Sequence, residues 1–345
     1  MRILAAMSGG VDSSVAAALL VEEGHDVVGV TLRLWENTGD AGCCSVAEIE
    51  DARGVANVLG IDHLVWTLVD EFDARVVAPY ASSHAAGLTP NPCIECNRHL
   101  KFGRLLRRAT TLGFDAVATG HHARIEPDGG GPRLRLLRGA DRYKDQSYVL
   151  YVLGQAELAR CRFPVGTMTK AEVRAKAAAL GLGTADKPDS QDVCFVTSSG
   201  GRQALLSSRI ALHPGRVVDR AGADVGRVEA LELVTVGQRR GLGTGGGARR
   251  YALDVDPVAR TVVVGEAADL LAPSVALTDL CWVGGPVESP APVQAQSSAH
   301  GVPIDAVFDD GAVRFAEPQR RVAPGQSVVL YRGEDVLGGG IATRA

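Results

Sequence analysis

The first half of the chain alternates short apolar runs with longer segments in which apolar residues recur every three or four positions. Four apolar runs predict buried strands, over residues 3–7, 26–34, 62–68 and 116–119. The helical periodicity predicts four helices, over residues 13–23, 45–60, 97–113 and 169–181. Strands separated by helices indicate a parallel sheet that is covered on both faces.

Local signals set the ends of these predicted helices. Ser45 to Glu48 and Thr169 to Glu172 have the spacing of a capping box, and each opens a helix. Asn97 is expected to cap the helix that follows it, because its side chain can accept a bond from a free backbone N–H.

After about residue 205 the pattern changes to short valine-rich runs separated by glycine and proline. These runs predict mostly antiparallel strands, at residues 216–219, 261–265, 306–308, 312–315 and 327–331. Asp309-Asp310-Gly311 is predicted to be a turn, and the segment 288–292 a loop. We therefore expect three domains, over residues 1–204, 205–267 and 268–345.

Composition narrows the class of protein. The chain has 345 residues, 46% of them apolar and 22% charged, which is typical of a globular protein. The net charge is −4, so a nucleic acid would have to be bound by local basic clusters. The start of the chain has no basic-then-apolar leader, and no run is long enough for a membrane span. The expectation is a cytoplasmic protein without a membrane partner.

Residues 8–13, SGGVDS, lie between the first predicted strand and the first predicted helix. A glycine-rich turn at this place directs backbone N–H groups at the positive end of the helix dipole, which suits phosphate. No lysine follows as in a Walker A loop, so transfer of the terminal phosphoryl group is not favoured. The alternative is a plain turn in which Asp12 or Ser13 only caps the helix.

Three cysteines stand near predicted helix ends: Cys93 and Cys96 in a C-x-x-C pair, and Cys194. A zinc or iron–sulfur site would need further ligands, and no second pair at matching spacing exists, so no metal site is predicted. A structural role as small buried side chains is a second possibility. The third is sulfur chemistry, because a helix start lowers the pKa of a thiol and makes the thiolate a nucleophile.

Six motifs in order resemble those of the tRNA-specific 2-thiouridylases, a family of the ATP pyrophosphatase (PP-loop) superfamily. They are SGGVDS at 8–13, TPNPxxxCN at 89–97, ATGHH at 118–122, KDQSY at 144–148, DSQDVCF at 189–195, and PGQ at 324–326 with LGGG at 337–340.

The resemblance implies an α/β fold: a parallel-sheet adenine nucleotide alpha-hydrolase-like domain, then a small β-rich central domain and a C-terminal β-barrel. It also implies that ATP, with Mg²⁺, adenylates the C2 oxygen of the wobble uridine in the tRNA anticodon stem-loop. A persulfide sulfur then replaces that oxygen, giving 2-thiouridine, AMP and pyrophosphate. A sulfur-carrier protein would supply the persulfide.

The family's functional positions map onto this chain as expectations. Cys194 would carry the persulfide and Cys96 would be the partner nucleophile, either freeing sulfide by forming a disulfide with Cys194 or assisting transfer directly. ATP would contact Ala6, Met7, Ser8, Gly9, Gly10, Val11, Asp12, Ser13, Leu32 and Gly120, with Asp12 as a partner for Mg²⁺. The tRNA would contact Asn91, Pro92, Cys93, His121, Lys144, Asp145, Gln146 and Gln326.

Two positions depart from the family pattern. Many relatives have aspartate where this chain has Cys93, which leaves the role of that side chain open. An Arg-Tyr pair expected near residue 296 is Gln296-Ser297 here, so a cation and a stacking ring are missing. Two basic clusters could bind RNA or simply be solvated: Arg98, Lys101, Arg104, Arg107 and Arg108, and Arg239, Arg240, Arg249 and Arg250.

Two alternatives to a 2-thiouridylase stay open at this point. One is another enzyme with the same nucleotide loop, such as a tRNA cytidine thiolase or an amide-forming synthetase. The other is a tRNA-binding or sulfur-carrier module without catalysis.

Overall fold

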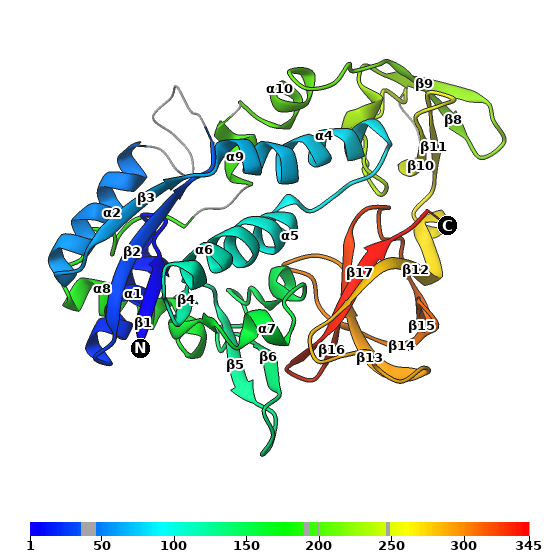
Figure 1. Ribbon diagram of the computed structural model, residues 1–345. Helices are drawn as coiled ribbons and strands as arrows, with labels where there is room; N and C mark the ends of the chain where they lie inside the picture. The colour runs from blue at the N-terminus through cyan, green and yellow to red at the C-terminus, as the bar shows by residue number, and fades with distance from the viewer. Residues whose placement is uncertain (36–45, 190–192, 199, 246–248, 345) are drawn as a thin grey trace.

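The computed structural model describes residues 1–35, 46–189, 193–198, 200–245 and 249–344, which form three β-sheets and the helices around the first of them (Figure 1). In Figure 1 the first sheet lies at the left, a small sheet at the upper right and a barrel at the lower right. Ser45 of the first predicted capping box and the middle of the DSQDVCF motif lie outside the described residues.

The N-terminal sheet is parallel throughout, as the alternation of strands and helices predicted. Its strands, in spatial order, are β3 (His63–Thr67), β2 (Asp26–Arg33), β1 (Arg2–Ala6), β4 (Ala116–Ala118) and β7 (Cys161–Arg162). The first four are the predicted strands, with ends shifted by one or two residues. The two-residue β7 was not predicted, because it is too short for an apolar pattern.

Helices cover both faces of this sheet, and each face has its own hydrophobic core. One core joins the sheet to α1 (Val11–Glu22), α2 (Val46–Leu59) and α8 (Lys170–Ala179). The other joins it to α3 (Val69–Phe72), η1 (Asp73–Val77), α4 (Ala78–Ala85), α9 (Cys194–Ser198), α10 (Arg202–Ser207) and the helical run 92–111. Shorter helices are η3 (Ser147–Leu150), α7 (Gln155–Leu158), η4 (Pro164–Thr167), η5 (Leu231–Leu233) and η6 (Ala268–Leu270).

The predicted start of the helix at Asn97 is wrong. The helical run begins five residues earlier, through α5 (Pro92–Glu95), the wider π-helical η2 (Cys96–Leu105) and α6 (Leu106–Thr111). Asn91 caps it, because its side chain accepts a bond from the Cys93 N–H at 3.1 Å. Asn97 is buried and donates to the carbonyl of Val149 at 3.0 Å, so its polarity serves a tertiary contact.

The remaining chain is β-rich, as predicted. A four-stranded sheet consists of β10 (Tyr251–Asp256), β11 (Thr261–Gly265), β8 (Gly215–Asp219) and β9 (Asp224–Val228). Six antiparallel strands then close into a barrel: β12 (Leu271–Trp282), β15 (Ala312–Arg320), β14 (Ile304–Asp309), β13 (Ala291–Gln296), β16 (Ser327–Arg332) and β17 (Asp335–Ala342). Asp310 and Gly311 form the predicted turn, both with positive φ.

A hairpin of the N-terminal part extends the barrel sheet. It consists of β5 (Ala123–Pro127) and β6 (Leu134–Arg138), and β6 pairs with β17 at Leu137 and Asp335. One hydrophobic core contains both Phe102 of the helical run and Val329 of the barrel. The nucleotide-loop half and the barrel are therefore packed as one body.

Candidate functional site

The glycine-rich loop lies between β1 and α1, at the carboxyl end of a central parallel strand. Gly9 has a φ of +72°, and Gly10 is extended and forms the N-cap of the twelve-residue α1. The Ser13 hydroxyl donates to the Gly10 carbonyl at 3.0 Å and accepts from the Ser8 N–H at 3.1 Å. The first N–H groups of a helix have no partner within it, so the loop presents donors at the positive end of α1.

The turn after β4 lies directly against this loop. A side chain at Gly120 would place its Cβ 2.5 Å from the Ser13 nitrogen and 2.6 Å from the Asp12 carbonyl carbon. Only glycine fits so close an approach of two backbones. Gly120 and the loop, predicted to share a nucleotide, are therefore in contact.

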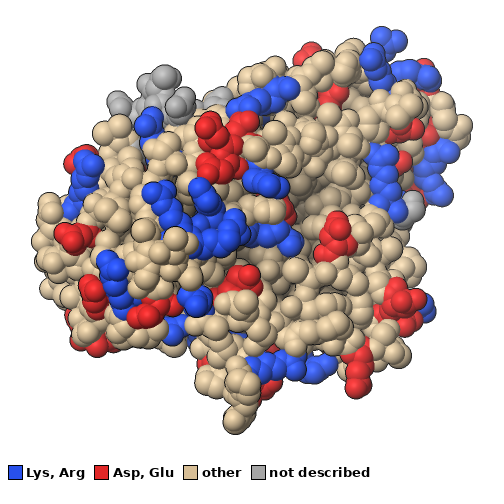
Figure 2. Space-filling view, viewed as in Figure 1, with Lys and Arg blue, Asp and Glu red and all other residues tan. Residues whose placement is uncertain are grey.

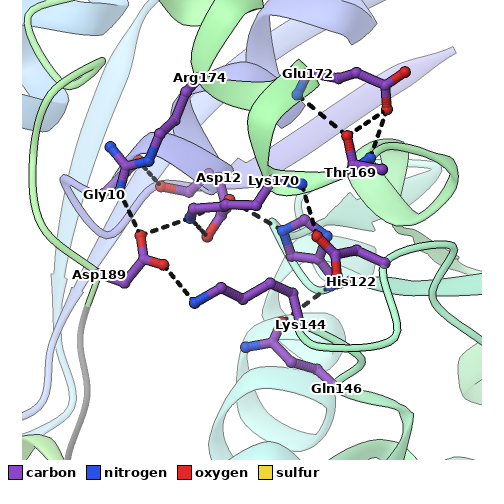
Figure 3. Close-up of polar contacts among 12 residues, drawn as sticks. Gly10, Asp12, His122, Lys144, Gln146, Thr169, Lys170, Glu172, Arg174 and Asp189 are labelled. Carbon is purple, nitrogen blue, oxygen red and sulfur yellow. Dashed lines mark hydrogen bonds and ion pairs between the residues drawn. The ribbon is translucent and has the colours of Figure 1, made fainter.

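Asp12 is the centre of a cluster of charged side chains that Figure 3 shows in close-up. Its carboxylate accepts from the Lys170 ammonium at 2.7 and 2.8 Å and lies 3.1 Å from Nε2 of the buried His122. Burial alone would raise the pKa of Asp12, but the bonds to His122 and Lys170 outweigh it and lower the pKa below 3.8. Asp12 is thus an ionised carboxylate held by a cation.

Asp189 forms the other side of the same cluster (Figure 3). Its carboxylate lies 2.7 Å from the Lys144 ammonium, 2.8 Å from that of Lys170 and 2.8 Å from the Arg174 guanidinium. Burial opposes ionisation, but the bonds from Lys144 and Lys170 dominate and lower the pKa of Asp189 to about 2. Lys170 therefore bridges the nucleotide loop to the start of the DSQDVCF motif.

A second lysine reaches the loop from another segment. The Lys187 ammonium donates to the Gly9 carbonyl at 3.0 Å and to the Asp51 carboxylate at 2.6 Å. Sequence reasoning missed Lys170, Lys187 and Arg174. The sequence contains little indication of a role at the loop for these residues. Lys170 lies within the capping box that Thr169 opens, and Lys187 lies just before the DSQDVCF motif.

The two cysteines with predicted catalytic roles pack against one hydrophobic core. Cys96 opens η2 and Cys194 opens α9, and both are partly buried against the core that also contains Leu32 and Ala6 of the sheet. All four predicted site residues therefore lie on the same face of the sheet. Their roles stay predictions.

Aromatic side chains hold the Cys194 segment in place. The Phe195 ring is buried and makes edge contacts with Phe72, at a centroid distance of 5.5 Å, and with Tyr80 at 5.6 Å. Tyr80 is electrostatically coupled to Cys93, which is exposed. Cys93 and the Cys194 segment thus approach the same side chain on α4.

The segment before Cys93 is clamped by the barrel. The Thr89 N–H donates to the Pro324 carbonyl at 2.7 Å, and the Gln326 amide donates to the Thr89 carbonyl at 2.7 Å. Gly325 fits between them with a φ of +90°. Gln326, predicted to contact tRNA, is here bonded to the segment that carries the predicted base contacts Asn91 and Pro92.

The predicted tRNA contacts of residues 121 and 144–146 differ in exposure. His121 is fully buried, its Nδ1 lies 2.7 Å from the Thr119 hydroxyl, and burial lowers its pKa well below 6.5. Asp145 is buried and accepts from Arg138, Gly139 and Ser147. Lys144 has 38% of its side chain exposed, and Gln146 is exposed and accepts from the His122 N–H at 3.0 Å. The roles of all four residues stay predictions.

Lysine and arginine side chains gather in the middle of the face that Figure 2 shows, over the helical run from α5 to α6 in Figure 1. This run carries the first predicted basic cluster, in which Arg104, Arg107 and Arg108 are exposed. Gln296, where a cation was expected, is buried and accepts from Arg138 at 3.0 Å. That position belongs to the packing between hairpin and barrel.

Among the described residues, no group of three or more His, Cys, Asp or Glu side chains is arranged to hold a metal ion. None of the helices within the described residues is both long and apolar enough to cross a membrane.

Three family models match the chain in succession. Residues 1–198 match the tRNA methyl transferase HUP domain, residues 203–266 the tRNA methyl transferase PRC-barrel domain, and residues 274–342 the aminomethyltransferase beta-barrel domain.

Curated relatives match over nearly the full length. The tRNA-specific 2-thiouridylases of Chloroflexus aurantiacus and Roseiflexus sp. are 48% and 47% identical, each over 99% of this chain and over 98% and 99% of their own length. That of Beutenbergia cavernae is 48% identical over 98% of this chain and 93% of its own. A solved 4-thiouridine synthetase in complex with RNA and ATP is 17% identical, covering 60% of this chain and 50% of its own, with a TM-score of 0.36.

Proposed function

The chain belongs to the tRNA-specific 2-thiouridylase family, and on this premise we propose that it replaces the C2 oxygen of the wobble uridine of tRNA with sulfur at the expense of ATP. The observation that carries the proposal is that two predicted nucleotide contacts, Ala6 and Leu32, pack against the same hydrophobic core as Cys96 and Cys194. Activation of the oxygen and delivery of sulfur take place at the same carbon atom, so the nucleotide site and the two cysteines have to be close.

The nucleotide loop fits a polyphosphate. Gly10 is open, since a Cβ there would meet only the Ser8 hydroxyl, at 3.5 Å, and the start of α1 directs its N–H groups outward. ATP supplies an AMP group that makes the C2 oxygen of uridine a good leaving group. The loop donors, Ser8 and Ser13 would hold the departing pyrophosphate, which stabilises charge that develops in the transition state.

Magnesium fits less well at Asp12. Both of its carboxylate oxygens accept from Lys170, and His122 binds one of them as well, so a metal ion would have to displace an ammonium group. That Mg²⁺ accompanies ATP therefore stays a prediction. In this arrangement Asp12 is not available as its protein ligand.

On the sulfur side, Cys194 would receive a persulfide from a carrier protein and present its outer sulfur to C2 of the activated uridine. AMP leaves with the former C2 oxygen as the new C–S bond forms. The S–S bond of the persulfide then breaks by attack of the Cys96 thiolate on Cys194, which leaves a Cys96–Cys194 disulfide and the new sulfur on the uridine.

The uridine must leave the anticodon stack to expose C2, which costs a few kcal/mol that protein contacts offset. The exposed arginines of the run from α5 to α6 would bind phosphates along the same helical run that carries Cys96. A cytoplasmic location belongs to the same proposal, since tRNA is used there.

The test is the Cys194→Ser variant, assayed with ATP, tRNA and a persulfide donor. We expect loss of 2-thiouridine, measured by mass spectrometry of digested tRNA, with ATP and tRNA binding retained. Cys281→Ser, on barrel strand β12, is the control and should keep its activity. Normal 2-thiouridine from Cys194→Ser would refute the persulfide role, and thiocytidine from the wild type would assign another substrate base.

A further inference from the structure

The nucleotide loop has an electrostatic deficit that its own residues cannot correct. Residues 6–15 contain one charged side chain, Asp12, which is negative, and they contain no lysine or arginine. A pyrophosphate leaving group carries several negative charges, so an aspartate without a nearby cation would repel it. Beyond the α1 N-terminus and the Mg²⁺ predicted to accompany ATP, positive charge has to come from side chains elsewhere in the fold.

Two ammonium groups reach the loop from distant parts of the sequence. Lys170, the first residue of α8, lies 158 positions from Asp12, and Lys187 lies 178 positions from Gly9. Lys170 binds the Asp12 carboxylate, and Lys187 binds the Gly9 carbonyl. Both amines therefore lie at the loop, one bound at Asp12 and the other at Gly9.

The surroundings hold Lys170 in place before a ligand arrives. Its side chain is 12% exposed and fixed between the carboxylates of Asp12 and Asp189, both with lowered pKa values. Its backbone N–H donates to Asp141 at 2.9 Å, and Thr169 caps the helix that it opens. A cation positioned in this way loses little rotamer freedom when a phosphate binds.

We propose that Lys170 and Lys187 form a two-lysine clamp that binds the β- and γ-phosphates of ATP and stabilises the departing pyrophosphate. The inference rests on the proposed function and extends it to residues outside the loop. The clamp takes the place of the lysine that a Walker A loop carries within its own sequence. The carboxylates of Asp12 and Asp51 act as positioning groups that hold the amines in the absence of nucleotide.

The experiment measures binding of inorganic pyrophosphate and of AMP to the full-length protein by calorimetry, for the wild type, Lys170→Met and Lys187→Met. We expect each variant to weaken pyrophosphate binding about tenfold or more, since a hydrogen bond to a charged group is worth about 1.5–3 kcal/mol. AMP has no β- or γ-phosphate, so its affinity should stay within about twofold of the wild type. Lys170→Arg, which keeps the charge, should recover part of the loss.

Lys176→Met is the matched control. Lys176 lies on the same helix and pairs with Glu22 at 2.7 Å, away from the loop, so its removal should leave pyrophosphate binding unchanged. If Lys170→Met fails to fold, Lys187→Met alone tests the clamp. This variant should fold, because Lys187 and Asp51 are partly exposed.

Wild-type pyrophosphate affinity in Lys187→Met and in any folded Lys170→Met would overturn the clamp and leave the proposed function standing. A parallel loss of AMP and pyrophosphate affinity would also overturn it, since that indicates general damage to the site. Absence of ATP and pyrophosphate binding in the wild type would overturn the clamp together with the proposed function.

Discussion

Asp189 shows how one side chain links two parts of the site. Three cations surround its carboxylate, two of them from α8 and one, Lys144, from the segment predicted to contact tRNA. The residue is the first of the DSQDVCF motif, so Lys144 and Lys170 also anchor the segment that carries Cys194. A phosphate that captured Lys144 or Lys170 would weaken this anchor.

The lowered pKa of Asp189 predicts a specific acid sensitivity. Its pKa is about 2 in the folded protein against 3.8 ordinarily, so its contribution to the free energy of unfolding is complete above pH 4 and lost as pH falls towards 2. In Asp189→Asn this part of the pH dependence should vanish, and stability at pH 7 should fall by about 2 kcal/mol, since one pKa unit corresponds to about 1.4 kcal/mol. Urea unfolding between pH 7 and pH 2 measures both.

Asp224→Asn serves as the control, because Asp224 pairs with Arg216 at the surface with 63% of its side chain exposed. It should alter neither quantity. An Asp189→Asn protein with wild-type stability at pH 7 would show that its three ion pairs contribute nothing net.

At the scale of elements, the barrel turn Pro324 to Gln326 holds the start of the helical run in place. The two hydrogen bonds to Thr89 join the turn before barrel strand β16 to the segment that leads to the helix capped by Asn91. Motifs 237 residues apart in the chain are thus neighbours in space. RNA bound on the barrel would act directly on the segment that leads to Cys96.

Gly325→Ala tests this clamp. An added Cβ would lie 2.9 Å from the Thr89 nitrogen, and φ is +90°, so we expect both strain and a displaced segment. The clash should cost about 1–3 kcal/mol beyond the strain. Amide hydrogen exchange of residues 88–97 should become faster.

Gly333→Ala provides the comparison, since Gly333 also has a positive φ, +60°, but nothing lies within 4 Å of its Cβ position. It should show the strain without faster exchange at residues 88–97. Equal effects of the two substitutions would mean that contact with Thr89 has no influence.

At the scale of the whole molecule, Arg138 joins the hairpin to the barrel. Its guanidinium binds Asp145 at 2.8 Å and Gln296 at 3.0 Å and lies 3.5 Å from the centre of the Tyr331 ring. All four side chains are buried. A shared core and a shared sheet predict that the two parts unfold together.

Arg138→Met should therefore lower the free energy of unfolding by about 3–5 kcal/mol, because it leaves the Asp145 carboxylate buried without its cation. It should also split one thermal transition into two, as calorimetry would show. Arg314→Met removes an exposed surface pair with Asp309 and should change stability by less than about 0.5 kcal/mol. A single transition with an unchanged midpoint would refute the coupling.

The sequence alone determined the features that depend on neighbouring residues. Apolar periodicity identified the first four strands of the parallel sheet, and the spacing from Thr169 to Glu172 identified a capping box that the structure contains. The motifs identified the family, because a phosphate loop or a pair of reactive cysteines needs particular residue types at short spacing. The helix start at Asn97 was misjudged since Asn91 offered the same capping chemistry.

Only the tertiary structure decided which distant side chains complete the site. The ion pairs of Lys170 with Asp12, the bond of Gln326 to Thr89 and the burial of Gln296 against Arg138 each join residues more than 150 positions apart. No local period encodes such contacts, because they depend on how strands order in a sheet and how the barrel closes. The sequence therefore shows that the nucleotide loop has no cationic side chain. Only the fold shows which distant residues bring positive charge to it.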